Sequence, residues 1–257
     1  HMTLGRGDAT AVAREKGKDV DLVVCCGGDG TLNEVVTGLL SKPGKIHTVG
    51  YIPAGTTNDF SKTLKLPANL MKAAQLAVEG SPCPCDMGSF NGRPFVYVAA
   101  FGVFSEVSYA TPQASKNALG HLAYVLQGAQ QLGKIESYKT RVEYDGGVVE
   151  ADLLYGSMSN STSVAGIVRL PSEMVCLGDG MSELVLVKNP GSVAGFGEIV
   201  ESVLSQRFDS ENLLILHTRQ ARFIFDKPVS WTRDGEAGGE YQDITLKNYE
   251  CPVQMIF

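Results

Sequence analysis

The stretch that decides the fold runs from Val20 to Glu34 and reads VDLVVCCGGDGTLNE. Its first half is an almost continuous apolar run, which is typical of a β-strand covered on both faces. Gly27, Gly28 and Gly30 then predict a turn in which backbone N–H groups can approach a phosphate closely. A helix should follow, because apolar residues recur on one face at helical spacing: Leu32, Val35, Val36, Leu39 and Leu40.

A second strand and turn follow the first. Ile46–Ile52 is another apolar run, and Pro53–Phe60 reads PAGTTNDF. The carboxyl ends of parallel strands meet at one edge of a sheet, where open α/β sheets bind ligands, so we expect the two turns to lie side by side. Each turn alone has a simpler interpretation, because Asp29, Thr57 or Asn58 could each cap a helix. The pair is much more specific than either member.

Asp29 lies inside the first glycine turn. A carboxylate there would repel a phosphate unless Mg²⁺ or water lay between them. We therefore interpret Asp29 as a metal-linked or hydroxyl-orienting carboxylate.

The remainder of the chain is richer in strand patterns. Leu70–Glu79 predicts a further helix, ended by Gly80. From about Cys85 onward, Asn91-Gly92 and Asp145-Gly146 predict β-hairpins. Further strands are expected at Leu184–Val187, Leu213–His217, Arg222–Phe225, Ile244–Leu246 and Val253–Phe257, and helices at about Lys116–Leu132 and Val193–Leu204.

These patterns predict an α/β protein with two lobes. Residues 1–84 would form a Rossmann-like parallel α/β nucleotide lobe, with residues 250–257 as a candidate addition to it. Residues 85–249 would form an antiparallel β-sandwich. Composition agrees with such a globular protein, since 44% of the residues are hydrophobic and 19% are charged. The net charge of -6 argues against a nucleic-acid partner.

GGDGTLNEVV at Gly27–Val36, followed by PAGTTNDF, resembles the catalytic domain shared by diacylglycerol kinases, sphingosine kinases, ceramide kinases and soluble bacterial relatives. The resemblance covers most of the chain and includes Thr3–Thr10, Asp86–Phe95, Leu177–Val187 and Asp234–Glu236. It implies a kinase that moves the γ-phosphate of ATP to a lipid hydroxyl, with diacylglycerol as the leading acceptor and phosphatidic acid as the product. It also implies that the β-sandwich is the lobe that binds the lipid.

The resemblance further implies roles for single residues. Contacts to ATP would come from Thr3, Gly27, Gly28, Asp29, Gly30, Thr31, Leu32, Asn33 and Thr56. Asp29, Asp59 and Asp86 would form an acidic cluster linked to Mg²⁺ through water. Asp179, the main-chain carbonyl of Met181 and Cys176 would hold a structural Mg²⁺. Glu236 would be the general base for the lipid hydroxyl, although Asp234-Gly235 and Asp179-Gly180 also fit plain β-turns.

The sequence also bears on location and partners. No apolar run approaches the ~18 residues of a transmembrane helix, and no signal peptide is visible. The six cysteines fit a reducing compartment. We expect a cytoplasmic protein without a transmembrane anchor that meets its lipid at the membrane surface. Related soluble enzymes suggest a homodimer.

Two departures from the family pattern keep other functions open. The strand and Asn-Pro-x-Ser-Gly loop that open the family do not precede Gly27, so the nucleotide lobe is expected to lack its first strand. Gly178 stands where many relatives carry a second aspartate, which should weaken a Mg²⁺ site. The alternatives are a related kinase of the NAD kinase type and a lipid-binding relative without transfer activity. No motif identifies the lipid.

Overall fold

The computed structural model describes residues 1–41, 44–103, 136–164, 168–208 and 210–257. Within these ranges the helices are α1 (Asp8–Lys16), α2 (Asp29–Leu40), α3 (Asp59–Thr63), α4 (Leu70–Glu79) and α6 (Val193–Ser205), with short 3-10 turns at Gly17–Asp19 and Ser172–Met174. The strands are β1 (Leu22–Gly27), β2 (His47–Pro53), β3 (Pro82–Phe90), β4 (Arg93–Phe95), β5 (Val98–Gly102), β6 (Tyr138–Tyr144), β7 (Gly147–Ser159), β8 (Ser163–Val164), β9 (Val168–Arg169), β10 (Ser182–Lys188), β11 (Leu213–Thr218), β12 (Gln220–Arg233) and β13 (Glu236–Ile256).

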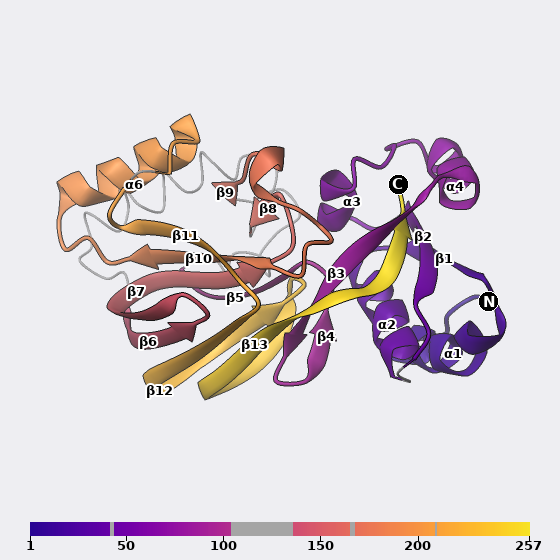
Figure 1. Cartoon of the computed structure of the whole chain (residues 1–257), viewed down its shortest axis with the longest axis horizontal. Helices are drawn as coiled ribbons and strands as arrows, with labels where there is room; N and C mark the ends of the chain where they lie inside the picture. Colours follow the sequence, from indigo (N-terminus) through magenta and orange to yellow (C-terminus); the bar gives the residue numbers. More distant parts are fainter. Residues whose placement is uncertain (42–43, 104–135, 165–167, 209) are drawn as a thin grey trace.

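The first lobe is built on parallel strands. β1 pairs in parallel with β2, and β2 pairs in parallel with the last residues of β13, where Val253 lies opposite His47. Figure 1 shows α1 and α2 on one side of these strands and α4 on the other. This is the strand–turn–helix alternation that the sequence predicts.

Close packing fixes α4 against β2. A side chain at Gly50 of β2 would lie 2.4 Å from the carbonyl oxygen of Ala77 in α4, so only glycine lets the helix approach this closely. The neighbouring Val49 and Tyr51 are buried in one cluster with Leu32 and Val36 of α2. Alternate residues of β2 thus pack against helices on opposite faces of the sheet.

The second lobe is an antiparallel sheet that curves around a second core. β12 pairs with β13, β5 and β6, and β7 pairs with β5, β6 and β10. Trp231, Phe101 and Phe223 lie at the centre of this core, with ring centroids 4.8–5.7 Å apart. The α/β class with an antiparallel β-rich second lobe is therefore as predicted.

Two strands pass from one lobe to the other. β3 pairs with β13 along its length, from Phe90 opposite Leu246 to Pro82 opposite Ile256 (Figure 1). The two strands expected at Ile244–Leu246 and Val253–Phe257 are thus one strand, β13, which is interrupted by a bulge near Cys251, where φ is 43°. β3 runs without a break through residues 84 and 85, where the sequence predicts the division between the two lobes. That division stays a prediction.

The expectation that the first strand is covered on both faces is wrong. β1 is the last strand of the described sheet, Val24 is 42% exposed and Cys26 is exposed as well. An apolar run marks a strand but does not report its place in the sheet. The helix expected at Lys116–Leu132 lies outside the described residues.

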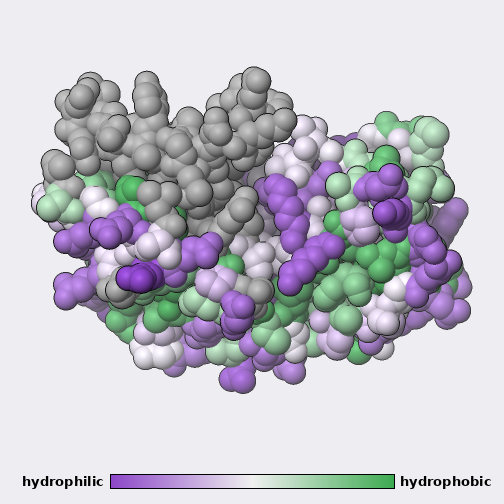
Figure 2. All heavy atoms as spheres, turned by 90° about the horizontal axis from the view of Figure 1, so that it is seen from above, coloured by the Kyte–Doolittle hydropathy of each residue, from purple (hydrophilic) through white to green (hydrophobic). Residues whose placement is uncertain are grey.

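The surface carries a few exposed apolar side chains. Figure 2 shows apolar residues among polar ones on the face that carries α4. Leu70, Met71 and Val78 of this helix are 50%, 79% and 62% exposed. Within the described ranges, no helix combines the length and apolar character needed to cross a bilayer.

Candidate active site

The two predicted turns touch each other. The backbone N–H of Ala54 donates to the carbonyl oxygen of Gly27 at 2.8 Å. A side chain built on Gly55 would lie 2.4 Å from the Cα atom of Gly28. Gly28 and Gly55 therefore form one backbone surface at the ends of β1 and β2, beside the N-terminus of α2. Such a surface, at the N-terminus of a helix whose first N–H groups and dipole face outward, is suited to bind phosphates.

Asp29 links the two turns through its side chain. Its carboxylate accepts the backbone N–H of Asp59 at 2.9 Å and that of Phe60 at 3.3 Å. Asp29 is thus the first residue of α2 but caps a different helix, α3. The pKa of Asp29 is raised to about 6, mainly by burial and also by the nearby Asp59 carboxylate, while the two N–H bonds oppose the shift.

Asn58 organises the second turn rather than capping α3. Its side-chain Oδ1 accepts the N–H of Gly55 at 2.9 Å, and its Nδ2 donates to the carbonyl oxygen of Gly55 at 2.8 Å. With φ at 50°, Asn58 is in the left-handed region that asparagine tolerates well. The turn is therefore held in shape before any ligand arrives.

The predicted cluster of three carboxylates does not form. Asp29 and Asp59 are neighbours, and Asp59 also pairs with Lys62 at 2.6 Å. Asp86 is fully buried elsewhere, where its carboxylate accepts N–H bonds from Gly180 and Cys251 at 2.7 and 2.6 Å. The reason is topological, because β3 carries Asp86 to the bulge of β13 and away from the glycine turns.

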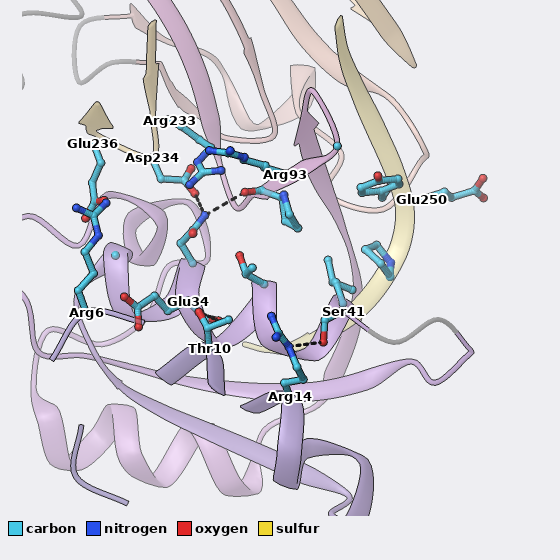
Figure 3. Close-up of a pocket in the computed structure, with 18 residues that line it drawn as sticks. Arg6, Thr10, Arg14, Glu34, Ser41, Arg93, Arg233, Asp234, Glu236 and Glu250 are labelled. Carbon is cyan, nitrogen blue, oxygen red and sulfur yellow. Dashed lines mark hydrogen bonds and ion pairs between the residues drawn. The ribbon is translucent and has the colours of Figure 1, made fainter. Parts of the chain in front are cut away.

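Glu236 reaches the first glycine turn from the other lobe. It begins β13 just after the Asp234-Gly235 hairpin turn, so the turn interpretation and a site role hold together. A side chain at Gly30 would lie 3.2 Å from Oε1 of Glu236. Oε2 of Glu236 forms an ion pair with Arg6 at 2.7 Å (Figure 3). Because both side chains are more than half exposed, this pair is weak and can exchange partners.

Asp234 joins the lobes beneath Glu236. Its buried carboxylate accepts backbone N–H bonds from Val96, Tyr97 and Val98 at 2.7–3.1 Å. It also accepts the side-chain amide of Asn33, which lies on α2, at 2.6 Å. Burial raises the pKa of Asp234, while these four donors favour its charged form. The position of Glu236 over α2 therefore depends on Asp234.

Replacing Asp234 with alanine should destabilise the protein strongly. Four donors would lose their acceptor, and each buried donor left unpaired costs roughly 1–3 kcal/mol. We expect the free energy of unfolding, measured in urea, to fall by about 3 kcal/mol or more. Asp243→Ala is the control. Among the described residues, the Asp243 side chain pairs only with the exposed Arg222, so its loss should leave the free energy of unfolding nearly unchanged. Equal stability of the two variants would contradict this role for Asp234.

The other residues predicted to contact ATP fall into two groups. Thr3 and Thr56 are exposed, and their side chains are free to meet a ligand. The side chains of the rest are engaged within the protein. Thr31 packs beneath Gly27, Leu32 is fully buried, and Asn33 donates to Asp234 and to the carbonyl oxygen of Pro94. A nucleotide could therefore meet Leu32 only through its backbone.

The segment predicted to hold a structural Mg²⁺ offers few ligands. Oδ1 of Asp179 accepts the N–H of Met181 at 2.9 Å, and Cys176 is exposed. In the part of the chain that the structure describes, no three His, Cys, Asp or Glu side chains are placed to bind one metal ion. This donor set does not fit a hard cation well, so the Asp179 site stays a prediction.

The sequence patterns missed two residues of this site. Arg6 lies in an Arg-Gly-Asp tripeptide that does not indicate a role in this site. The contact with Glu236, 230 positions away, is visible only in the folded structure. Asp234 was part of a recognised acidic motif, but its buried junction with Val96–Val98 is a tertiary contact. The Asp-Gly turn was the only available signal for it.

Comparison with known proteins gives the same answer as the geometry. Residues 1–90 match the diacylglycerol kinase catalytic domain. The chain is 33% identical to the diacylglycerol kinase of Bacillus subtilis over 242 residues, which are 93% of this chain and 79% of that protein. It is 34% identical to the Staphylococcus aureus diacylglycerol kinase (strain JH9) over 245 residues, which are 91% and 74% of the two chains.

Solved structures agree on the fold. The crystal structure of a diacylglycerol kinase from Bacillus anthracis superposes with a TM-score of 0.75 at 24% identity, covering 99% of this chain and 83% of that one. An NAD kinase from Archaeoglobus fulgidus, solved with ATP, superposes with a TM-score of 0.51 at 15% identity, covering 95% and 80%. Both likenesses concern the fold alone.

A glycine-rich backbone surface on an α/β lobe, reached by an acidic residue from a β-rich lobe, is the arrangement expected of a two-lobed kinase. Similarity to curated relatives over nearly the whole chain narrows this class. The chain belongs to the diacylglycerol kinase family. It is therefore a lipid kinase, a transferase that uses ATP as its phosphoryl donor.

Proposed function

We propose that this protein transfers the γ-phosphate of ATP to the free hydroxyl of diacylglycerol and so forms phosphatidic acid. The observation that carries the proposal is the contact between the Gly28 and Gly55 turns, with Glu236 of the other lobe over Gly30. The similarity to proteins named diacylglycerol kinase supports this acceptor.

The donor would be held mainly by backbone. The N–H groups of Gly28 and Gly30 and the N-terminus of α2 would supply partial positive charge to the phosphates, while the Gly55 turn would let them approach closely. Thr3 and Thr56, whose side chains are exposed, would add hydroxyl contacts. Arg6 is the cation next to Glu236, and an exposed guanidinium can turn from a carboxylate to a phosphate at little cost.

We propose that Mg²⁺ accompanies the nucleotide at Asp29 and Asp59. The observation that supports a cation is electrostatic, since Asp29 is buried near both Asp59 and Asp234, and negative charge accumulates beside a phosphate cradle. Asp29 and Asp59 would hold the ion through water, because the Asp29 carboxylate already accepts two backbone N–H bonds and the Asp59 carboxylate already pairs with Lys62. The ion would neutralise charge on the transferred phosphate.

Glu236 would act as the general base. Its carboxylate takes the proton of the acceptor hydroxyl while that oxygen forms a bond to the γ-phosphorus. The bond between the γ-phosphorus and the bridging oxygen breaks, and ADP leaves with both electrons of that bond. The exposed position of Glu236 at the junction of the lobes allows an acceptor to reach it from the second lobe.

A single assay series tests the proposal. The purified protein is incubated with labelled ATP, Mg²⁺ and one acceptor at a time: diacylglycerol in mixed micelles, sphingosine, or NAD. We expect label in phosphatidic acid. Label in NAD would instead support the NAD kinase alternative, whose fold is shared. Binding of ATP without transfer to any acceptor would support the non-catalytic alternative.

The setting of the reaction follows from its substrate. We propose that the protein acts in the cytoplasm and meets diacylglycerol peripherally at a membrane surface, and that it forms a homodimer. Sedimentation with vesicles that contain diacylglycerol tests the first point. Analytical ultracentrifugation tests the second.

The pKa of Asp29 predicts a pH dependence of stability. Burial raises this pKa from 3.8 to about 6, so between these values the folded state keeps a proton that the unfolded chain has lost. The stabilising contribution is complete below pH 3.8 and is lost as the pH rises through about 6. In the absence of Mg²⁺, wild type should lose roughly 2 kcal/mol more than Asp29→Asn between pH 4 and pH 7. Urea unfolding at a series of pH values measures this difference, and parallel curves would contradict it.

A further inference from the structure

A groove runs along α2 on the side away from the Gly55 turn. Its volume is about 740 Å³, which is in the range of small-molecule sites. Glu236 and Arg6 lie at one end, and the walls come from α1, α2, the β3–β4 hairpin and β13 (Figure 3). Gly30 lines the groove and is shared with the proposed ATP cradle, but Gly28, Gly55 and Thr56 are not part of the lining, so the groove adjoins that cradle and extends away from it.

Two unpartnered arginines line this groove. Arg93 begins β4 and Arg233 ends β12. Among the described residues, neither side chain has a hydrogen bond or ion pair. Their backbones are held close together, because Asn33 donates both to Pro94, next to Arg93, and to Asp234, next to Arg233. Two like charges fixed at one junction repel each other unless an anion lies between them.

The acidic residues of the groove do not supply that anion. Glu34 accepts the N–H of Gly7, Glu236 pairs with Arg6, and Asp234 is saturated by four donors. Glu250 is turned toward Gly180, where a side chain would lie 3.4 Å from its Oε2. Figure 3 likewise shows the Glu250 carboxylate pointing away from the middle of the groove.

The opposite wall adds donors of the same kind. Nε of Arg14, on α1, donates to Ser41 at 3.1 Å, and within the described residues its terminal nitrogens have no hydrogen-bond partner. Thr37 and Tyr249 contribute hydroxyl groups to the lining. Guanidinium forks with nearby hydroxyls match the geometry and charge of a phosphate better than those of a single carboxylate.

We propose that this groove is a second anion site, which binds a phosphate group between Arg93 and Arg233 with Arg14 opposite. The ligand class is a phosphate-bearing anion, either free or as the headgroup of a lipid phosphate. The evidence for this site is the charge of Arg93 and Arg233 and the shape of the groove around them, so the site does not depend on which acceptor the enzyme uses.

Calorimetric titration of the intact protein tests the proposal. Inorganic phosphate should bind to the wild type, with and without saturating ADP and Mg²⁺, and Arg93→Gln/Arg233→Gln should weaken this binding at least tenfold. The control is Arg207→Gln, because Arg207 is an exposed arginine outside the groove. Arg93→Lys/Arg233→Lys, which keeps the charge, should retain part of the affinity and guards against a folding defect in the glutamine variant.

A second arm identifies the source of the phosphate. Dihexanoyl phosphatidic acid is compared with inorganic phosphate and with dihexanoylglycerol, which lacks the phosphate. Tighter binding of the phosphatidic acid, lost in the double glutamine variant, assigns the site to a lipid headgroup, whereas equal binding of phosphate assigns it to a free anion. Competition between ADP and phosphate, or phosphate binding that the double variant leaves unchanged, would overturn the second site.

Discussion

Replacing Glu236 with glutamine should lower kcat by about 10²- to 10⁴-fold, which is the usual contribution of a positioned general base. The amide cannot take the proton of the acceptor hydroxyl, but it has nearly the same size. It can still accept a hydrogen bond from Arg6, and the Asp234-Gly235 turn is untouched, so the position of the side chain should persist. The affinity for ATP should change little. Initial rates with diacylglycerol at saturating ATP, together with ATP titration, measure both quantities.

The matched control for this variant is Glu240→Gln. Glu240 lies on the same strand, β13, and its exposed side chain accepts a hydrogen bond from Ser230, its one side-chain hydrogen bond among the described residues. Its kcat should equal that of the wild type. Full turnover by Glu236→Gln would remove the base assignment, and a large increase in the KM for ATP without a change in kcat would make Glu236 a binding residue instead.

Local patterns predicted the elements well. The glycine turn, the helix that becomes α2, α4 and both Asn91-Gly92 and Asp145-Gly146 hairpins are found where the sequence placed them. The adjacency of the two turns was also predictable, because parallel strands bring their carboxyl ends to one edge. These features depend on hydrophobic periodicity and on turn-forming residues, both of which are determined by residues close together in the sequence.

Long-range contacts were not predictable in the same way. Asp29 caps α3 instead of α2, Asp86 is drawn to the β13 bulge, and Arg6 meets Glu236 across the lobes. Each depends on how two distant segments pack, and the residue type alone fits several partners. The exposed face of β1 has the same origin, since tertiary packing decides which face of a strand is covered.

Replacing Gly55 with alanine should impair ATP binding more than a glycine-to-alanine replacement at any other position in this site. The new Cβ would lie 2.4 Å from the Cα of Gly28, 2.8 Å from Oδ1 of Asn58 and 3.1 Å from the N of Gly28. Two of these are backbone atoms, which cannot rotate away as a flexible side chain can. The turns must therefore move apart, and we expect the Kd for ATP with Mg²⁺ to rise at least tenfold, about 1.4 kcal/mol.

Gly28→Ala provides a graded comparison at the same contact. Its Cβ would lie 3.2 Å from the Cα of Gly55, so a shift of a few tenths of an ångström accommodates it, and the loss of affinity should be smaller. Gly197→Ala in α6 meets no atom within 4 Å and should bind ATP as the wild type does. The order Gly55, Gly28, Gly197 in loss of affinity thus tests the shared backbone cradle directly. If Gly55→Ala bound ATP normally by calorimetry, the phosphates would have to bind somewhere other than between these two turns.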